Sequence, residues 1–125
     1  RSGRLEVGMN KNCNKKLTEI ETKAVGGLIS GLRELYGENL SKVILYGSKA
    51  RGDGHKDSDI DVMVVLKKIG NLFIEREKVY ELAWQLSYKH DLLISVLVRD
   101  ENYYREALTP LMWNINREGV GLWVQ

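Results

Sequence analysis

Hydrophobic residues recur at every third or fourth position between Leu17 and Leu35, which predicts an amphipathic helix. The start of this helix is indicated by Thr18 followed three positions later by Glu21, a pairing typical of a capping box. Gly37 is typical of the residue that ends a helix. The first element expected along the chain is therefore a helix with one apolar face.

Three short apolar runs predict strands, over residues 42–47, 59–66 and 91–98. The first run, KVILYG, is apolar almost throughout and ends in glycine, which favours a strand buried on both faces. The second run, DIDVMVVL, differs because two carboxylates stand among its apolar residues. The third run, DLLISVLV, has no such pair.

Residues 71–90 predict a second long helix, because Leu72 and Val79 belong to a set of apolar residues spaced for one face. Residues 102–124 predict two short helices broken near Pro110, followed by a terminal stretch. The order α-β-β-α-β-α predicts a fold of the α/β (α+β) class, in which helices pack against a small sheet.

The composition narrows the class of protein. A chain of 125 residues is most simply one domain, expected over 17–125, whereas residues 1–16 are polar, lack periodicity and are interpreted as a disordered or tag-derived segment. A net charge of +2 is too small to favour a nucleic-acid partner. No apolar run approaches the ~20 residues of a membrane span, and the single cysteine, Cys13, suits a reducing compartment. We therefore expect a cytoplasmic protein without a membrane or nucleic-acid partner.

The two carboxylates of the second strand are the first candidate for chemistry. Side chains at i and i+2 of a strand point to the same face, so Asp59 and Asp61 project together while Ile60 and Val62 point into the core. Two like charges side by side repel each other unless a cation shares them, and hard oxygen ligands favour Mg²⁺ or Mn²⁺. The alternative is an edge strand with a solvent-exposed outer face.

The end of the first strand favours the metal site over the solvent-exposed edge strand. Gly47 permits the backbone to approach a ligand closely, and if a short helix begins at Ser48, its free N–H groups and hydroxyl form an anion site. A phosphate beside a carboxylate-bound metal is the arrangement that phosphoryl or nucleotidyl transfer needs. The same segment lacks the Gly-Lys-Ser/Thr of a Walker A loop and the glycine spacing of a dinucleotide-binding loop.

The segment GSKARGDGHKDSDIDV, residues 47–62, resembles the signature of the nucleotidyltransferase superfamily related to DNA polymerase beta. Its halves GSxARG and SDID are similar to those of minimal nucleotidyltransferases, small catalytic domains often encoded beside a HEPN-domain protein as toxin–antitoxin pairs. The resemblance implies a mixed sheet and a Mg²⁺-dependent transfer of a nucleoside monophosphate, AMP from ATP, to an acceptor hydroxyl on a HEPN-type toxin. The alternative is an antitoxin, weakly catalytic or non-catalytic, that neutralises its partner by direct contact.

The resemblance also implies roles for single residues. Asp59 and Asp61 would coordinate two Mg²⁺ ions. Four neighbouring residues are assigned to the nucleotide and its phosphates, namely Gly47, Ser48, Arg51 and Lys49. For Arg51 the equal alternative is to brace the loop by pairing with Asp53, Asp57 or Asp59, and for Lys49 the alternative is a solvated side chain.

A third carboxylate is where the sequence departs from the pattern. Active members carry it on a later strand, on the face of the first two, and in the run 91–98 that place falls on Ser95. Serine cannot replace a carboxylate as a base or charged ligand. Asp91 is on the same side but four residues earlier, roughly 13 Å along a strand. Asp91 is thus a catalytic acid only if the strand runs in another register, and otherwise a turn residue.

Aromatic residues recur at every fourth position of the second helix, as Tyr80, Trp84 and Tyr88. Packing in the core or against another subunit is expected, with base stacking as the alternative. Tyr103 and Trp113 belong to a second aromatic group, which suggests a partner surface.

Overall fold

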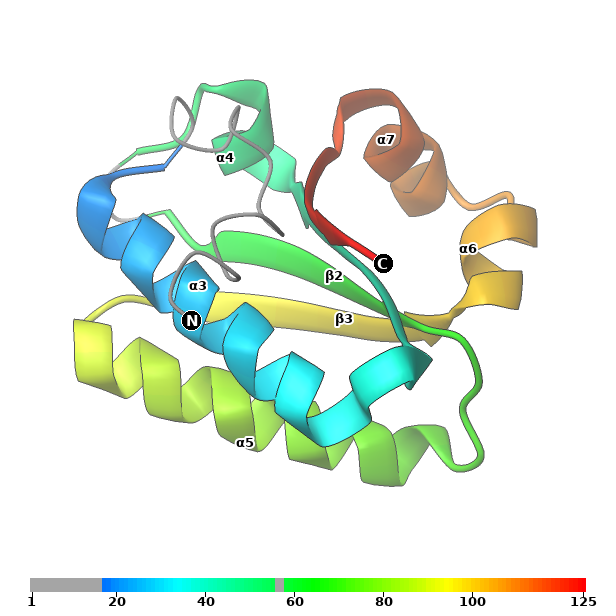
Figure 1. Cartoon of the computed structure of the whole chain (residues 1–125). Coiled ribbons are helices and arrows are strands. Elements are labelled where there is room, and N and C mark those ends of the chain that lie inside the picture. Colours follow the sequence, from blue (N-terminus) through cyan, green and yellow to red (C-terminus); the bar gives the residue numbers. More distant parts are fainter. Residues whose placement is uncertain (1–16, 56–57) are drawn as a thin grey trace.

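The computed structural model describes residues 17–55 and 58–125 (Figure 1). The predictions made for 1–16, including Cys13, lie outside the described residues. The elements follow in the order α3 (Glu19–Tyr36), the 3-10 turn η1 (Gly37–Asn39), β1 (Leu40–Tyr46), α4 (Gly47–Arg51), β2 (Ile60–Leu66), α5 (Leu72–His90), β3 (Ile94–Asp100), α6 (Glu101–Glu106), α7 (Pro110–Glu118) and β4 (Val120–Val124).

One four-stranded sheet, ordered β3-β2-β1-β4, organises the described part of the chain. β1 runs antiparallel to both β2 and β4, whereas β2 and β3 are parallel. The predicted α/β class with a small mixed sheet is confirmed. β4 was not predicted as a strand, because five residues after a glycine carry too little periodicity to distinguish a strand from a terminal stretch.

The first helix begins and ends where the sequence indicates. Thr18 Oγ1 accepts from the backbone N–H of Glu21 at 3.1 Å, and Glu21 Oε1 accepts from the backbone N–H of Thr18 at 2.9 Å. This is the predicted capping box. The helix ends at Gly37, which has a positive φ of 53°.

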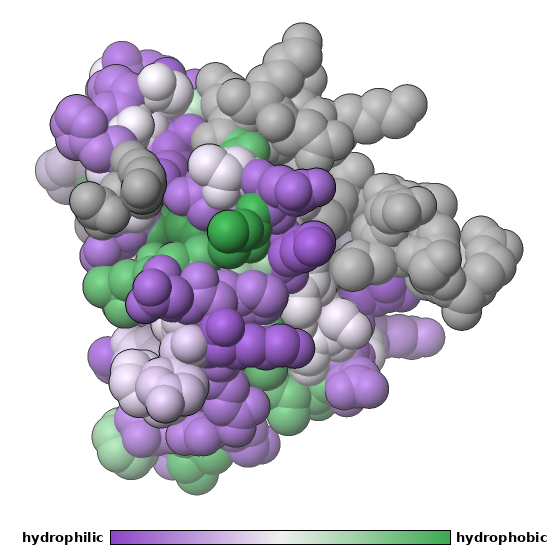
Figure 2. Space-filling model, turned by 90° about the vertical axis from the view of Figure 1, so that its left-hand side faces the viewer, coloured by the Kyte–Doolittle hydropathy of each residue, from purple (hydrophilic) through white to green (hydrophobic). Residues whose placement is uncertain are grey.

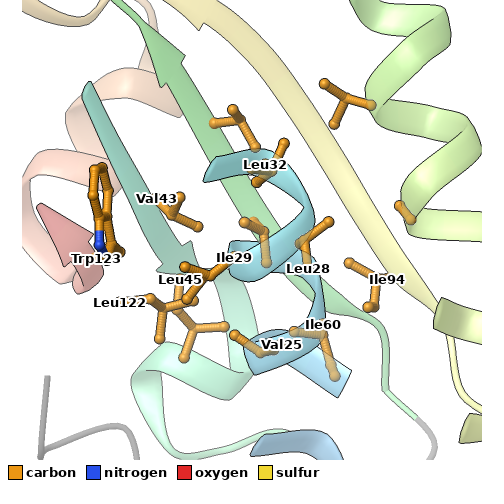
Figure 3. Packing of buried hydrophobic residues seen from close by; sticks show 14 of the residues in the cluster. Val25, Leu28, Ile29, Leu32, Val43, Leu45, Ile60, Ile94, Leu122 and Trp123 are labelled. Carbon is orange, nitrogen blue, oxygen red and sulfur yellow. The ribbon is translucent and has the colours of Figure 1, made fainter. Parts of the chain in front are cut away.

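Helices cover both faces of the sheet (Figure 1). α3 and α5 pack on one face, where the larger core lies, and α6 and α7 pack on the other. Figure 3 shows side chains of α3 packed against side chains of the strands in the larger core. The buried residues labelled there are Val25, Leu28, Ile29, Leu32, Val43, Leu45, Ile60, Ile94, Leu122 and Trp123.

The aromatic side chains of α5 lie outside the core. α5 buries the face that carries Val79, Ala83 and Ser87, so the stripe one residue further along each turn faces solvent. Trp84 is 61% exposed and Tyr88 is 79% exposed, and their ring centroids are 6.0 Å apart. The prediction that these aromatics pack in the core is wrong, whereas the alternative of a subunit interface stays a prediction.

Within residues 17–55 and 58–125, no helix has the length and hydrophobicity that a transmembrane segment requires.

Candidate active site

The two carboxylates lie where the second strand begins. Asp59 directly precedes β2 and is exposed, whereas Asp61 is the second residue of the strand and is half-buried. Ile60 and Val62, on the opposite face, are fully packed in the larger core. The alternation of the strand therefore presents both carboxylates on the face that α7 covers further along β2.

The charge of this pair is costly in the absence of a cation. The pKa of Asp61 is raised above its ordinary value of 3.8, first by burial and then by the neighbouring charge of Asp59, while Arg51 acts to lower it. Burial, followed by the charge of Asp61, also raises the pKa of the Tyr46 hydroxyl. The protein thus holds an acid where its ionised form is disfavoured, which is typical of a functional site.

A glycine turn meets this carboxylate pair. β1 ends at Tyr46, the register partner of Asp61, and the chain turns at Gly47 with φ +77° into the short helix α4. A Cβ atom at Gly47 would collide with Asp61 Oδ2. Only glycine permits this approach, so the carboxylate of Asp61 lies directly against the backbone at Gly47.

Ser95 completes the group. It is the register partner of Asp61 in the parallel pair of β2 and β3, and its hydroxyl donates to Asp59 Oδ2 at 3.1 Å. The structure therefore brings together Gly47, Asp59, Asp61 and Ser95. A neutral hydroxyl therefore stands beside the two carboxylates.

Asp91 lies apart from this group. It ends α5 in a left-handed conformation, with φ 54° and ψ 52°, and its backbone N–H donates to the carbonyls of Ser87 and Tyr88. Its side chain is exposed, and β3 begins only at Ile94. Within residues 17–55 and 58–125, no three histidine, cysteine or acidic side chains are grouped at metal-binding spacing. The structure thus gives Asp91 the place of a turn residue between helix and strand.

Arg51 has the bracing contacts that were one of its two alternatives. Its Nε lies 3.3 Å from Asp53 Oδ2, and one terminal nitrogen lies 3.5 Å from Glu118 Oε1. These acids, Asp53 first, raise the pKa of the guanidinium. Asp57, another expected partner, lies outside the described residues. The pairing with Glu118 joins α4 to α7, and no local pattern in the sequence predicts it.

Lys49 is the clearest departure from the sequence-based interpretation. Its side chain is 6% exposed, and Nζ donates to Glu21 Oε2 at 2.6 Å and to the backbone carbonyl of His55 at 2.7 Å. The expectation of a solvated lysine is wrong, because the side chain is buried and the ammonium is bound by a carboxylate of α3 and a backbone carbonyl instead of water. These contacts indicate a structural role for Lys49 in place of the predicted contact with phosphate.

A groove of about 310 Å³ runs between α5 and β3. Its lining includes Tyr80, Ala83, Trp84, Leu93, Ser95 and Val96. Because Ser95 also bonds to Asp59, one end of this α5–β3 groove borders the carboxylate pair. Figure 2 shows the side of the molecule that lies on the left in Figure 1, where hydrophilic residues predominate and hydrophobic patches lie between them.

Comparison with known proteins agrees with this geometry. Residues 26–108 match the family model described as a nucleotidyltransferase domain. A protein of Methanocaldococcus jannaschii named "Putative protein adenylyltransferase MJ0141" is 41% identical over 83 residues, which are 66% of this chain and 79% of that protein.

Two solved structures share the fold. One, a toxin–antitoxin structure with AMP-PNP, superposes with a TM-score of 0.56 at 26% identity over 78% of this chain and 72% of the other. A second, from Shewanella oneidensis, contains a tri-AMPylated HEPN toxin in complex with an MNT antitoxin. It aligns with a TM-score of 0.55 at 23% identity, covering 83% of this chain and 72% of the other, an identity at which the likeness concerns the fold.

The sheet, the glycine turn and the carboxylate pair together define a nucleotidyltransferase. The chain belongs to the nucleotidyltransferase domain family, since the family model matches more than half of it. The nucleotidyltransferase resemblance stated from residues 47–62 is therefore confirmed at the level of the family, and the fold is shared with an antitoxin structure described as an MNT antitoxin bound to a HEPN toxin.

Proposed function

We propose that this nucleotidyltransferase moves AMP from ATP onto a hydroxyl of a partner protein, with Mg²⁺ or Mn²⁺ held by Asp59 and Asp61. The observation that carries the proposal is the contact between the Asp61 carboxylate and the Gly47 turn, with Asp59 beside it. A carboxylate that touches a phosphate-binding turn is placed for a metal that bridges protein and triphosphate.

The donor set suits a hard divalent cation. Two carboxylates repel each other here, and burial of Asp61 adds to the cost of its charge, so a cation would relieve both effects. Mg²⁺ sites commonly use one or two protein carboxylates together with substrate phosphates. When bound, such an ion neutralises charge on the triphosphate and favours ionisation of the attacking hydroxyl.

The chain's own residues orient the reaction. Gly47 permits the triphosphate to approach the backbone, and Ser48 follows it in the first turn of α4. The acceptor oxygen forms a bond to the α-phosphorus, the bond from that phosphorus to the bridging oxygen breaks, and pyrophosphate leaves. The hydroxyl proton passes to Asp59, the more exposed of the two carboxylates, and from Asp59 to solvent.

The relatives support AMP as the transferred group and a protein as the acceptor. The name of the M. jannaschii relative describes a protein adenylyltransferase, and the neighbour at 26% identity was solved as a toxin–antitoxin structure with an ATP analogue. We extend both properties to this chain, with a HEPN-type toxin as the partner.

The α5–β3 groove offers a route for that acceptor. It borders the carboxylate pair through Ser95, and Trp84 and Leu93, both more than half exposed, line it with apolar surface. Partly exposed aromatics are enriched where proteins bind one another. A partner docked along this groove would carry its hydroxyl toward Asp59.

The experiment incubates the purified chain with α-labelled ATP, Mg²⁺ and a candidate HEPN-type protein, and follows label on the protein by gel and mass spectrometry. Asp59→Asn and Asp61→Asn preserve shape but remove the charges, and each should abolish transfer. Glu77→Gln, an exposed acid on α5, serves as the matched control. Transfer that persists in both aspartate variants, or that is unaffected by removing divalent ions with EDTA, contradicts the proposal.

The second candidate is an antitoxin that acts by contact, and Ser95 favours it. A neutral hydroxyl beside the pair leaves the metal site one carboxylate short of the pattern of active members. In that case the Asp59→Asn and Asp61→Asn variants would neutralise the toxin to the same extent as the unaltered chain. No label would appear on the toxin.

A further inference from the structure

A buried ion pair links the first helix to the turn that carries the site. Lys49 in α4 and Glu21 in α3 are 28 positions apart, and their charged atoms lie 2.6 Å from each other with 6% and 8% of the side chains exposed. Glu21 uses its other oxygen, Oε1, to cap the start of α3 through the backbone of Thr18. One carboxylate therefore serves both the helix start and the lysine.

The lysine extends this link toward the catalytic carboxylates. Its ammonium also donates to the carbonyl of His55 at 2.7 Å, and the same carbonyl accepts from the backbone N–H of Ser58 at 3.0 Å. Ser58 Oγ in turn accepts from the backbone N–H of His55 at 2.8 Å. Because Ser58 directly precedes Asp59, the path Glu21–Lys49–His55–Ser58 ends at the backbone of a proposed metal ligand.

The phosphate side of the site is attached to the same lysine. Ser48, its neighbour in the chain, accepts at its carbonyl from the N–H groups of Gly52 and Asp53 at 3.0 and 3.2 Å. Gly54 lies so close that an added Cβ would stand 3.1 Å from Ser48 Oγ and 3.2 Å from the Lys49 backbone nitrogen. The loop that follows α4 is thus folded back onto Ser48 and held there by Lys49.

We infer that Lys49 and Glu21 are a positioning pair, which sets the distance between the Gly47–Ser48 turn and Asp59 although neither side chain touches nucleotide or metal. A buried ion pair adds little net stability compared with apolar residues of similar volume, because desolvation opposes the attraction between the charges. Such a pair is instead suited to specifying one arrangement of the segments it joins. The inference rests on the proposed function for its activity readout.

A double variant separates positioning from stability. Lys49→Met leaves a buried carboxylate and Glu21→Gln leaves a buried ammonium, so each single variant should have a clearly lower melting temperature, the usual result of breaking a buried pair. The double variant Lys49→Met/Glu21→Gln buries no charge, and glutamine still serves in a capping box. Its melting temperature should recover toward that of the unaltered chain, while His55 remains without the lysine that held its carbonyl.

Two measurements on the double variant decide the matter, with the exposed Lys78→Met as the control. Initial rates of label transfer should fall roughly 10- to 100-fold, as when residues supporting a metal site are lost. Hydrogen exchange at the Ser58 amide, measured by NMR without nucleotide, should accelerate by about tenfold or more. Lys78→Met should change neither.

Each result has a distinct meaning. A refolded double variant that keeps both the transfer rate and the protection of the Ser58 amide overturns the inference. If the unaltered chain transfers no label, the proposed function fails, and amide exchange alone decides whether the pair positions the loop. Faster exchange in the double variant then supports positioning, and unchanged exchange refutes it.

Discussion

The hydroxyl of Ser95 donates a hydrogen bond to Asp59 Oδ2, at a distance of 3.1 Å. Because Ser95 is also the register partner of Asp61, a neutral side chain stands beside the two carboxylates at the point of the sheet where a third could reach them. This relationship leads to a gain-of-function prediction, since a negative charge at this position would add a metal ligand.

Ser95→Asp should raise the affinity for Mn²⁺ roughly 10- to 100-fold, the scale on which residues around a metal site act, and should increase the rate of label transfer. Without metal the same variant should be less stable, because three carboxylates then repel one another. Isothermal titration with Mn²⁺ and thermal unfolding with and without metal measure the two effects. Ser95→Asn adds bulk without charge, and a similar gain in Ser95→Asn would contradict the explanation.

Asp91→Asn addresses the other candidate for the third acid. Asparagine tolerates the left-handed conformation that this residue adopts at the end of α5, so the fold should be unchanged. We expect label transfer within about twofold of the unaltered chain, because the side chain is exposed and outside the group at Ser95. A loss of transfer comparable with that of Asp59→Asn, in a chain that still melts normally, would assign Asp91 to catalysis.

Gly47→Ala should lower the free energy of unfolding by more than the positive φ of this residue alone explains. Gly37 provides a matched control, because both glycines have positive φ but a Cβ at Gly37 meets nothing within 4 Å, whereas one at Gly47 meets Asp61. Gly37→Ala should lower the free energy of unfolding by about 1–3 kcal/mol, because φ 53° with ψ −124° is a conformation that residues with a Cβ rarely adopt, and Gly47→Ala should lower it by about 1–3 kcal/mol more, because its Cβ also meets Asp61. Only Gly47→Ala should also abolish transfer. Equal losses of stability in urea unfolding would contradict the contact.

Asp61→Asn should stabilise the metal-free protein at neutral pH. The raised pKa of Asp61 means that the native state binds more protons than the unfolded state above pH 3.8, so the free energy of unfolding falls as pH rises through the interval up to the raised pKa. The difference between variant and unaltered chain should therefore grow across that interval and then level off. Denaturation without metal at a series of pH values measures it.

Added Mg²⁺ should reverse this order, because an ion bound to the native carboxylates stabilises only the unaltered chain. A difference in stability that is independent of pH, or one that decreases as pH rises, would show that burial and the charge of Asp59 do not disfavour the ionised form.

Trp84→Ala should weaken transfer to the protein acceptor without weakening nucleotide binding. Truncating a central aromatic residue of an interface commonly costs more than about 1 kcal/mol, so KM for the acceptor should rise about fivefold or more. Trp113 on α7 is the control, since it is 63% exposed compared with 61% for Trp84 but lies outside the α5–β3 groove. Equal effects of Trp84→Ala and Trp113→Ala would place acceptor docking elsewhere.

Local patterns were sufficient for much of the fold. The capping box of Thr18 and Glu21, the helix stop at Gly37 and the strands around the glycine turn all depend on residues close together in sequence. Such features are set by backbone sterics, side-chain periodicity and short-range hydrogen bonds, which a single sequence displays directly. The strand that begins near Asp59 was predictable for the same reason, since apolar residues continue on its buried face.

Contacts between segments far apart in the sequence determined the features that local patterns did not predict. Nothing near Lys49 in the sequence indicates that Glu21, 28 positions earlier, neutralises it in the interior. The contact of Ser95 with Asp59, 36 positions away, depends on the register of two parallel strands. The exposure of Trp84 follows from which face α5 turns toward the sheet. Local periodicity specifies elements and the residues that share a face, whereas burial, ion pairing and register arise only when distant segments pack, because they are properties of the contact between those segments.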